Sequence, residues 1–202
     1  KRADICVMNS FGYLLANKKY GAKAKLKVIR YGKEYYRGQI IAHVDSNINT
    51  IKDIEGKKFA FTDSSSTSGF MFPLKILLDN KVTPKNTTFA MKHDNVVTMI
   101  YQKQVDAGAT FYSTPSEKGD IRDARYLVKT QFPDVEKKIK IIEITEKIPN
   151  DPFVFRKNLP SDIEAKFISA LKKFLSTKEG KLAFKNIYSV TGVVDADDSD
   201  YD

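Results

Sequence analysis

Five consecutive hydroxyl residues and a glycine connect a predicted apolar strand to a predicted apolar helix, at positions 64–69. Backbone N–H groups at a helix start have no intrahelical partner and lie at the positive end of the helix dipole, so they attract anions. Serine and threonine hydroxyls add neutral donors. The segment predicts an anion site at Ser66, Thr67 and Ser68, with a serine loop and one ordinary N-cap as the alternative. Pro73 requires either a later helix start or an irregular first turn.

A second predicted helix start carries a histidine just before its cap. The cap is expected at Asp94 or Asn95, which would let His93 point at whatever the first helix start binds. A neutral or a protonated imidazole can donate a hydrogen bond to an anion, and a purely structural hydrogen bond is the alternative role. A serine, His93 and Asp151 do not predict a hydrolase, because the G-x-S-x-G elbow is absent.

Composition and charge narrow the function classes further. The 202 residues carry a formal charge of +9, and five aspartates lie in the last eight positions, so residues 1–194 alone carry +14. The lysines are scattered singly or in pairs, which argues against nucleic-acid binding and favours a general positive field for small anions. No apolar run is long enough for a membrane span. No residue spacing predicts a metal site or a cofactor, and the acidic tail is expected to be solvated.

Apolar periodicity alternates between strand and helix, which indicates an α/β fold with parallel strands. Capping boxes are expected to start two C-terminal helices, with Ser161 and Glu164 in the first and Ser176 and Glu179 in the second. The other elements are expected as strands at 5–8, 26–31, 39–43, 58–61, 88–91, 105–111 and 140–144, and as helices at 13–19, 70–80, 95–103 and 120–130.

Two extended segments could cross between lobes. Residues 26–43 are too long for one ordinary strand, and residues 148–155 place two prolines around an aspartate before an apolar strand. Two crossings would divide the chain into a first lobe of 1–41 and 149–202 and an inserted second lobe of 42–148.

Several segments occur together here in an order that is typical of one family. The most specific are Ser66-Thr67-Ser68-Gly69 with its spacing to His93, and Ile148-Pro149-Asn150-Asp151-Pro152; Tyr36 and the end Asp198-Ser199-Asp200-Tyr201-Asp202 also fit. Over essentially its whole length, the sequence resembles the phosphonate-, phosphite- and phosphate-binding proteins of ABC importers.

That resemblance implies a two-lobed periplasmic-binding-protein fold with two hinge crossings, closing on an oxyanion between the lobes. It also implies a non-enzymatic solute-binding protein without a cofactor, which delivers a phosphorus oxyanion to a membrane permease from a periplasmic or other extracytoplasmic location, either free or lipid-anchored. The alternative is a ligand-sensing domain of a signalling protein with the same fold.

The resemblance also assigns the binding residues. Ser66, Thr67 and Ser68 would grip the phosphorus-bound oxygens, and His93 and Tyr36 would donate to them, with Tyr35 as the alternative if the strand slips by one residue. Asp151 would lie in the same pocket. Because a carboxylate accepts a hydrogen bond only from a ligand that carries a proton or an amine, we expect Asp151 to favour protonated phosphorus oxyanions and to repel sulfate.

The sequence departs from the family in two places. Members that bind an aminoalkyl phosphonate have an acidic residue shortly after the strand at 105–109, but no acid occurs here before Glu117. A compact anion such as phosphate, phosphite or a methyl-type phosphonate is therefore expected. Members also begin with a β-α-β-α segment upstream of this chain, so we expect the natural protein to be longer or its first lobe to be completed by a partner.

Overall fold

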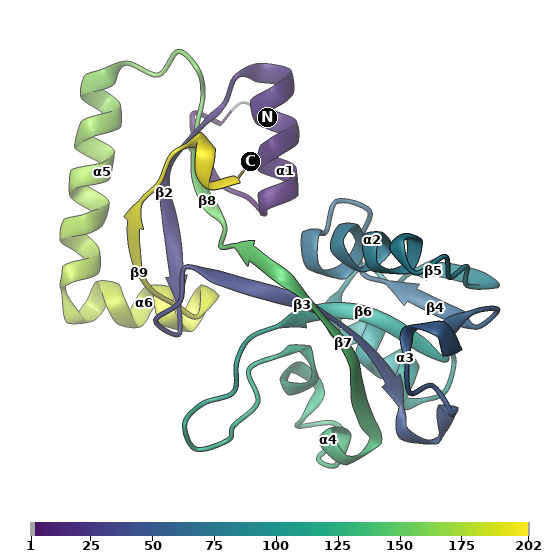
Figure 1. The fold of residues 1–202 in the computed structure, drawn as a ribbon. Coiled ribbons are helices and arrows are strands. Elements are labelled where there is room, and N and C mark those ends of the chain that lie inside the picture. The colour runs from purple at the N-terminus through teal and green to yellow at the C-terminus, as the bar shows by residue number, and fades with distance from the viewer. Residues whose placement is uncertain (1–2, 202) are drawn as a thin grey trace. The chain divides into compact units, whose positions relative to one another are not determined.

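The structure is a computed structural model that describes residues 3–201, and the chain folds into two units, each with its own sheet (Figure 1). Unit 1 consists of Lys1–Tyr35 and Pro149–Asp202, and unit 2 of Tyr36–Ile148. The first division lies six residues before the expected 41/42 boundary. It lies there because strand β3 (Tyr35–His43) pairs with a strand of unit 2 from Arg37 onwards. The mixed α/β fold expected from the sequence is confirmed.

Unit 1 is built on a four-stranded sheet in the order β1-β8-β2-β9. All three neighbouring pairs are antiparallel, so the expectation of parallel strands is wrong for this unit. Its elements are β1 (Ile5–Val7), α1 (Ser10–Tyr20), β2 (Lys23–Arg30), β8 (Pro152–Phe155), α5 (Ser161–Ser176), α6 (Lys178–Tyr188) and β9 (Val190–Asp195).

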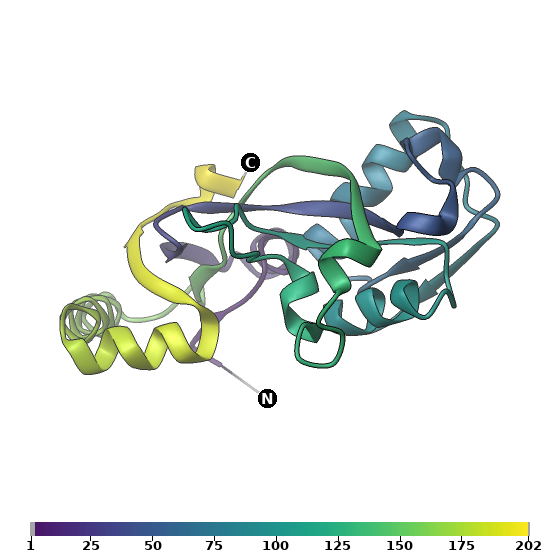
Figure 2. The same cartoon turned by 90° about the horizontal axis from the view of Figure 1, so that it is seen from below.

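Both faces of this sheet are covered. Leu26 and Val28 pack with residues of α5 and α6 on one face, whereas Ala24 packs with Tyr13 of α1 on the other. A register shift between Ala24 and Leu26 places these two residues on opposite faces. Figure 1 and Figure 2 show α6 running across the end of α5, with which it is in contact.

Unit 2 is built on a five-stranded sheet in the order β5-β4-β6-β3-β7. Strand β4 pairs parallel with both β5 and β6, and β3 runs antiparallel to β6. The carboxyl ends of the three parallel strands therefore meet at one edge, where open α/β sheets bind ligands. The remaining elements are β4 (Lys58–Phe61), α2 (Phe72–Asp79), β5 (Asn86–Phe89), α3 (His93–Tyr101), β6 (Ala107–Tyr112), α4 (Val135–Lys138) and β7 (Ile139–Pro149).

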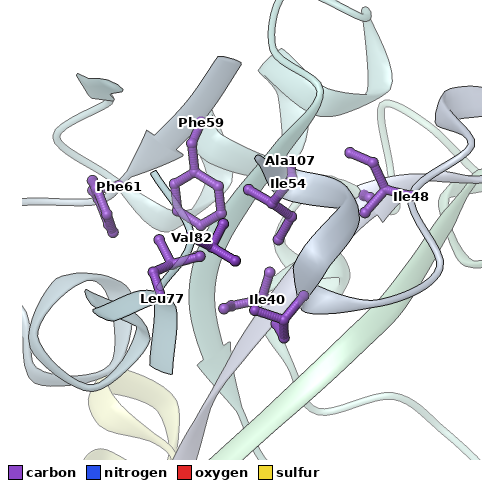
Figure 3. Packing of buried hydrophobic residues seen from close by; sticks show 11 residues of the cluster. Ile40, Ile48, Ile54, Phe59, Phe61, Leu77, Val82 and Ala107 are labelled. Carbon is purple, nitrogen blue, oxygen red and sulfur yellow. The ribbon is translucent and has the colours of Figure 1, made fainter. Parts of the chain in front are cut away.

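The pleat of β4 divides the core of unit 2 between the two faces of the sheet. Phe59 and Phe61 pack with Leu77 of α2 on one face (Figure 3), and Ala60 between them packs with Val96 of α3 on the other. Full burial of one such large side chain contributes about 1.5–3 kcal/mol. Helices on both faces thus hold β4 and the segment that follows it in place.

Three local predictions are wrong. The helix expected at 120–130 is only a five-residue 3-10 turn, Ala124–Val128, which Asp123 caps by accepting from the backbone N–H of Arg125. The first capping box does not form, because Ser161 is already helical and Pro160 occupies the cap position. The second fails because Thr177, one residue after Ser176, accepts from the N–H of Gly180.

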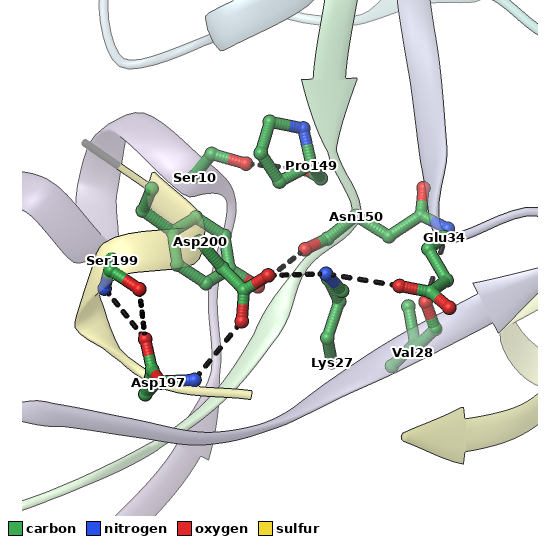
Figure 4. Close-up of polar contacts among 10 residues, drawn as sticks. Ser10, Lys27, Val28, Glu34, Pro149, Asn150, Asp197, Ser199 and Asp200 are labelled. Atoms are coloured by element: carbon green, nitrogen blue, oxygen red, sulfur yellow. Dashed lines mark hydrogen bonds and ion pairs between the residues drawn. The ribbon is translucent and has the colours of Figure 1, made fainter. Parts of the chain in front are cut away.

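The end of the acidic C-terminal tail is docked on unit 1 through polar contacts and buried Tyr201 (Figure 4), whereas Asp195 and residues 197–200 remain exposed, as expected of a solvated end. Asp198 accepts from the Tyr13 hydroxyl at 2.5 Å and from the Ala24 N–H at 3.0 Å. Burial, together with this carboxylate, raises the pKa of Tyr13, so the hydroxyl keeps its proton and donates. Asp200 lies 2.8 Å from the ammonium of buried Lys27, and buried Tyr201 donates to the carbonyl of Asn150.

These contacts predict that Asp198→Ala destabilises the protein by about 2 kcal/mol, because the Tyr13 hydroxyl, the Ala24 N–H and the side-chain amide of Asn17 lose a charged acceptor. Urea denaturation measures the change. Asp195→Ala is the matched control, since the Asp195 side chain forms an exposed ion pair with Lys172, whose loss should have a much smaller effect. Equal effects of the two substitutions would contradict a docked tail.

Candidate ligand-binding site

The hydroxyl segment after β4 forms a π-helical turn, Thr67–Met71, that leads directly into α2. Ser66 is the N-cap, and its Oγ accepts from the N–H of Gly69 at 3.0 Å. The N–H of Met71 donates to the carbonyl oxygen of Ser66, five residues back, at 3.0 Å. Both outcomes expected from Pro73 occur, because the first turn is irregular and the α-helix proper starts only at Phe72.

Pro73 also explains how this turn is attached to the sheet. In an ordinary α-helix the N–H of residue 73 would donate to the carbonyl oxygen of Gly69, but proline has no N–H. That oxygen accepts instead from the N–H of Thr62, the first residue after β4, at 3.0 Å. A Cβ on Gly69 would lie 2.1 Å from Thr62 Oγ1, so the approach requires glycine.

His93 is the first residue of α3, two positions before the start that the sequence predicted, and Lys92 occupies the cap position without a side-chain hydrogen bond. Its Nδ1 accepts from the backbone N–H of Phe111 at 3.3 Å and lies 3.2 Å from Thr62 Oγ1. Because a backbone amide can only donate, Nδ1 carries no proton, and the neutral ring carries its proton on Nε2. Burial lowers the pKa of His93 to about 4, so the ring is neutral at pH 7.

Four of the six predicted site residues are thereby linked in unit 2. The turn that contains Ser66, Thr67 and Ser68 is attached to Thr62 through Gly69, and His93 is attached to the side chain of the same threonine. Ser68 is only 2% exposed, yet within residues 3–201 neither its Oγ nor Nε2 of His93 forms a hydrogen bond. Two donors at this sheet edge therefore remain available.

The fifth predicted residue, Tyr36, lies near the start of β3 in unit 2 and is half-buried. Gly38, two residues later, lies against the turn, since a Cβ there would be 2.7 Å from the carbonyl oxygen of Ser68. Side chains alternate along a strand, so Tyr36 shares the face of β3 that meets the turn, and Tyr35 does not.

The sixth predicted residue, Asp151, belongs to unit 1 and precedes β8. Its carboxylate forms an ion pair with the guanidinium of Arg30 at 2.7 Å, and both side chains are about one-fifth exposed. No local pattern of residues indicates this partner, because Arg30 lies 121 positions away in the chain. Thr62 was also missed, although its place between strand β4 and the hydroxyl segment could have indicated it.

The described part of the chain, residues 3–201, offers neither a metal centre nor a membrane-spanning helix. No group of three or more His, Cys, Asp or Glu side chains there could hold a metal ion. No helix there is both long enough and apolar enough to cross a bilayer.

The lowered pKa of His93 predicts a pH-dependent stability. His93 has a pKa of about 4 in the folded protein and of 6.5 in the unfolded chain, so between these two pH values only the unfolded chain binds the proton. The folded protein therefore has its full stability above pH 6.5 and loses stability as the pH falls from 6.5 to about 4. The loss amounts to about 3 kcal/mol across this range. Urea denaturation at several pH values should show that the free energy of unfolding falls less on acidification in His93→Gln than in the wild type. His43 is present in both proteins, so equal losses would contradict a neutral His93.

Comparisons with known proteins identify the family. The family model described as "ABC transporter, phosphonate, periplasmic substrate-binding protein" matches residues 1–201. The chain is 28% identical over 163 residues to the phosphonates-binding periplasmic protein of Escherichia coli (strain K12), covering 77% of this chain and 45% of that protein. It is 29% identical over 137 residues to the phosphate-import protein PhnD of Mycolicibacterium smegmatis, covering 59% and 43%.

The chain thus spans less than half the length of these two relatives. Among solved structures, PhnD1 from Prochlorococcus marinus in complex with methylphosphonate is similar, with a TM-score of 0.76 and 15% identity over 98% of this chain and 74% of that one. The match to the family model covers nearly every residue and includes both the hydroxyl segment and the docked tail. This chain therefore belongs to the family of periplasmic phosphonate substrate-binding proteins of ABC transporters.

Proposed function

We propose that this chain is the binding component of an ABC importer, which captures a phosphorus oxyanion and passes it to a membrane permease. The proposal rests on two donors at the carboxyl edge of the parallel strands, Ser68 Oγ and His93 Nε2, which form no hydrogen bond within residues 3–201. The protein acts without chemistry on the ligand, in the periplasm or an equivalent extracytoplasmic compartment. Family membership supports this role.

Neutral donors suit a ligand that must be released again. Hydrogen bonds to a charged oxygen are worth about 1.5–3 kcal/mol each, so several hydroxyl, imidazole and backbone donors can hold a tetrahedral anion without a buried cation. We propose that Ser66, Thr67 and Ser68 hold the phosphorus-bound oxygens together with His93, and that Tyr36 adds a phenolic donor from β3.

We infer that the ligand is compact. Positions 110–114, at and after the end of β6, contain no acidic residue that could pair with the amine of an aminoalkyl phosphonate. The names of the relatives, which refer to phosphonates, phosphate import and methylphosphonate, are consistent with phosphate, phosphite or a small alkyl phosphonate.

Calorimetric titration with methylphosphonate, phosphite, phosphate and sulfate tests the proposal. The wild type should bind at least one phosphorus oxyanion more tightly than sulfate, and Ser68→Ala should weaken that binding by about tenfold or more, since it removes one hydrogen bond to a charged group. Ser64→Ala, in the exposed part of the same segment, is the matched control and should bind like the wild type. A preference for sulfate, or equal effects of both substitutions, would overturn the proposed site.

Asp151 is proposed to select against ligands that carry no proton. Its ion pair with Arg30 orients the carboxylate, which can accept only from a protonated oxyanion. Asp151→Asn should therefore reduce the ratio of phosphate to sulfate affinity by about tenfold, because the amide no longer repels sulfate. Asp162→Asn makes the same charge change at an exposed ion pair of α5 and should leave this ratio unchanged. Unchanged affinities for both anions in Asp151→Asn would remove the selectivity role.

A further inference from the structure

Thr62 joins the two halves of the proposed site through four hydrogen-bonding contacts. Its N–H donates to the carbonyl oxygen of Gly69 at 3.0 Å, and its own carbonyl oxygen accepts from the N–H of Met91, two residues before α3, at 2.7 Å. Its Oγ1 donates to the carbonyl oxygen of Ala109 at 3.1 Å and lies 3.2 Å from Nδ1 of His93. The residue is 3% exposed, so these contacts are shielded from water.

The contact with Nδ1 has a direct chemical consequence. Nδ1 accepts from the N–H of Phe111, so its lone pair faces the protein. The Thr62 hydroxyl has one proton, which it donates to Ala109, and its Oγ1 packs against Nδ1 on the same side of the ring. Imidazole has two nitrogens, and the hydrogen bonds of one determine which of them carries the proton. Holding Nδ1 as an acceptor therefore leaves Nε2–H as the donor of His93.

The main chain of Thr62 acts on the other half of the site. Its N–H fixes Gly69, which lies directly after Ser66, Thr67 and Ser68, and the Cβ of Thr62 leaves no room for a side chain at Gly69. One residue thus sets the position of the hydroxyl turn and the orientation of the histidine ring together.

We propose that Thr62 is a positioning residue of the phosphorus-oxyanion site: its hydroxyl holds His93 with Nε2–H as the ligand donor, while its backbone fixes the turn at Ser66–Ser68. The inference rests on the proposed function, since it assigns to Thr62 the orientation of groups that bind the ligand. Thr62 does not touch the anion and acts only through its neighbours.

The test compares Thr62→Val, which keeps the shape and removes the hydroxyl, with Thr62→Ser, which keeps the hydroxyl. In the ligand-free protein, the ¹⁵N resonance of His93 Nδ1 should move in Thr62→Val and remain close to its wild-type position in Thr62→Ser. The chain has only two histidines. His43, whose Nδ1 accepts from the N–H of Asp45, is an internal control and should not change in either variant.

Calorimetry with methylphosphonate and phosphate supplies the second measurement. Thr62→Val should raise the Kd by about tenfold, and Thr62→Ser should restore it to within about threefold of the wild type. Wild-type nitrogen shifts and affinity in Thr62→Val would overturn the inference, and Thr62→Ala gives the same comparison if the valine variant does not fold. Failure of the proposed function is distinguishable, because it would appear as a wild-type protein that binds no phosphorus oxyanion.

Discussion

The carbonyl oxygen of Gly69 would ordinarily accept from the N–H of the residue four positions later, but that residue is Pro73. This oxygen accepts instead from the N–H of Thr62, and that hydrogen bond attaches the first turn of the helical segment to the end of β4. The close approach is possible only because Gly69 has no side chain. The irregular π-turn, the cap at Ser66 and the link to His93 all depend on this junction, because each is anchored to Thr62 or to the turn that it holds.

The electrostatic character of the site follows from the same packing. Burial keeps His93 neutral, so the ring offers a donor without a positive charge. The surplus of basic residues raises the positive potential around the whole chain and favours the approach of anions. The lysines therefore attract anions at long range, whereas the neutral donors recognise the ligand, because their geometry can distinguish one oxyanion from another.

Charge pairing in unit 1 has a different purpose. Asp198 and Asp200 satisfy donors and a cation of the sheet and of α1, and Tyr201 fills the space beside Tyr13. Lys27 is almost completely buried, and the carboxylates of Asp200 and Glu34 compensate its charge. A tail that looks like a solvated acidic end in the sequence therefore also has a structural role, because two of its carboxylates accept from or pair with groups of unit 1.

The sequence by itself determined the hydroxyl segment at a strand–helix junction, the histidine at a second helix start and most strands and helices, because each depends on residues that are neighbours in the chain. Tertiary structure alone decided that Thr62 holds both helix starts and that Arg30 pairs with Asp151. It also decided that the sheet of unit 1 is antiparallel and that the acidic tail is docked. Apart from the contact of Thr62 with Gly69, these features join residues 31 to 185 positions apart, and no local pattern of residue types records which distant groups will meet once the sheets have packed.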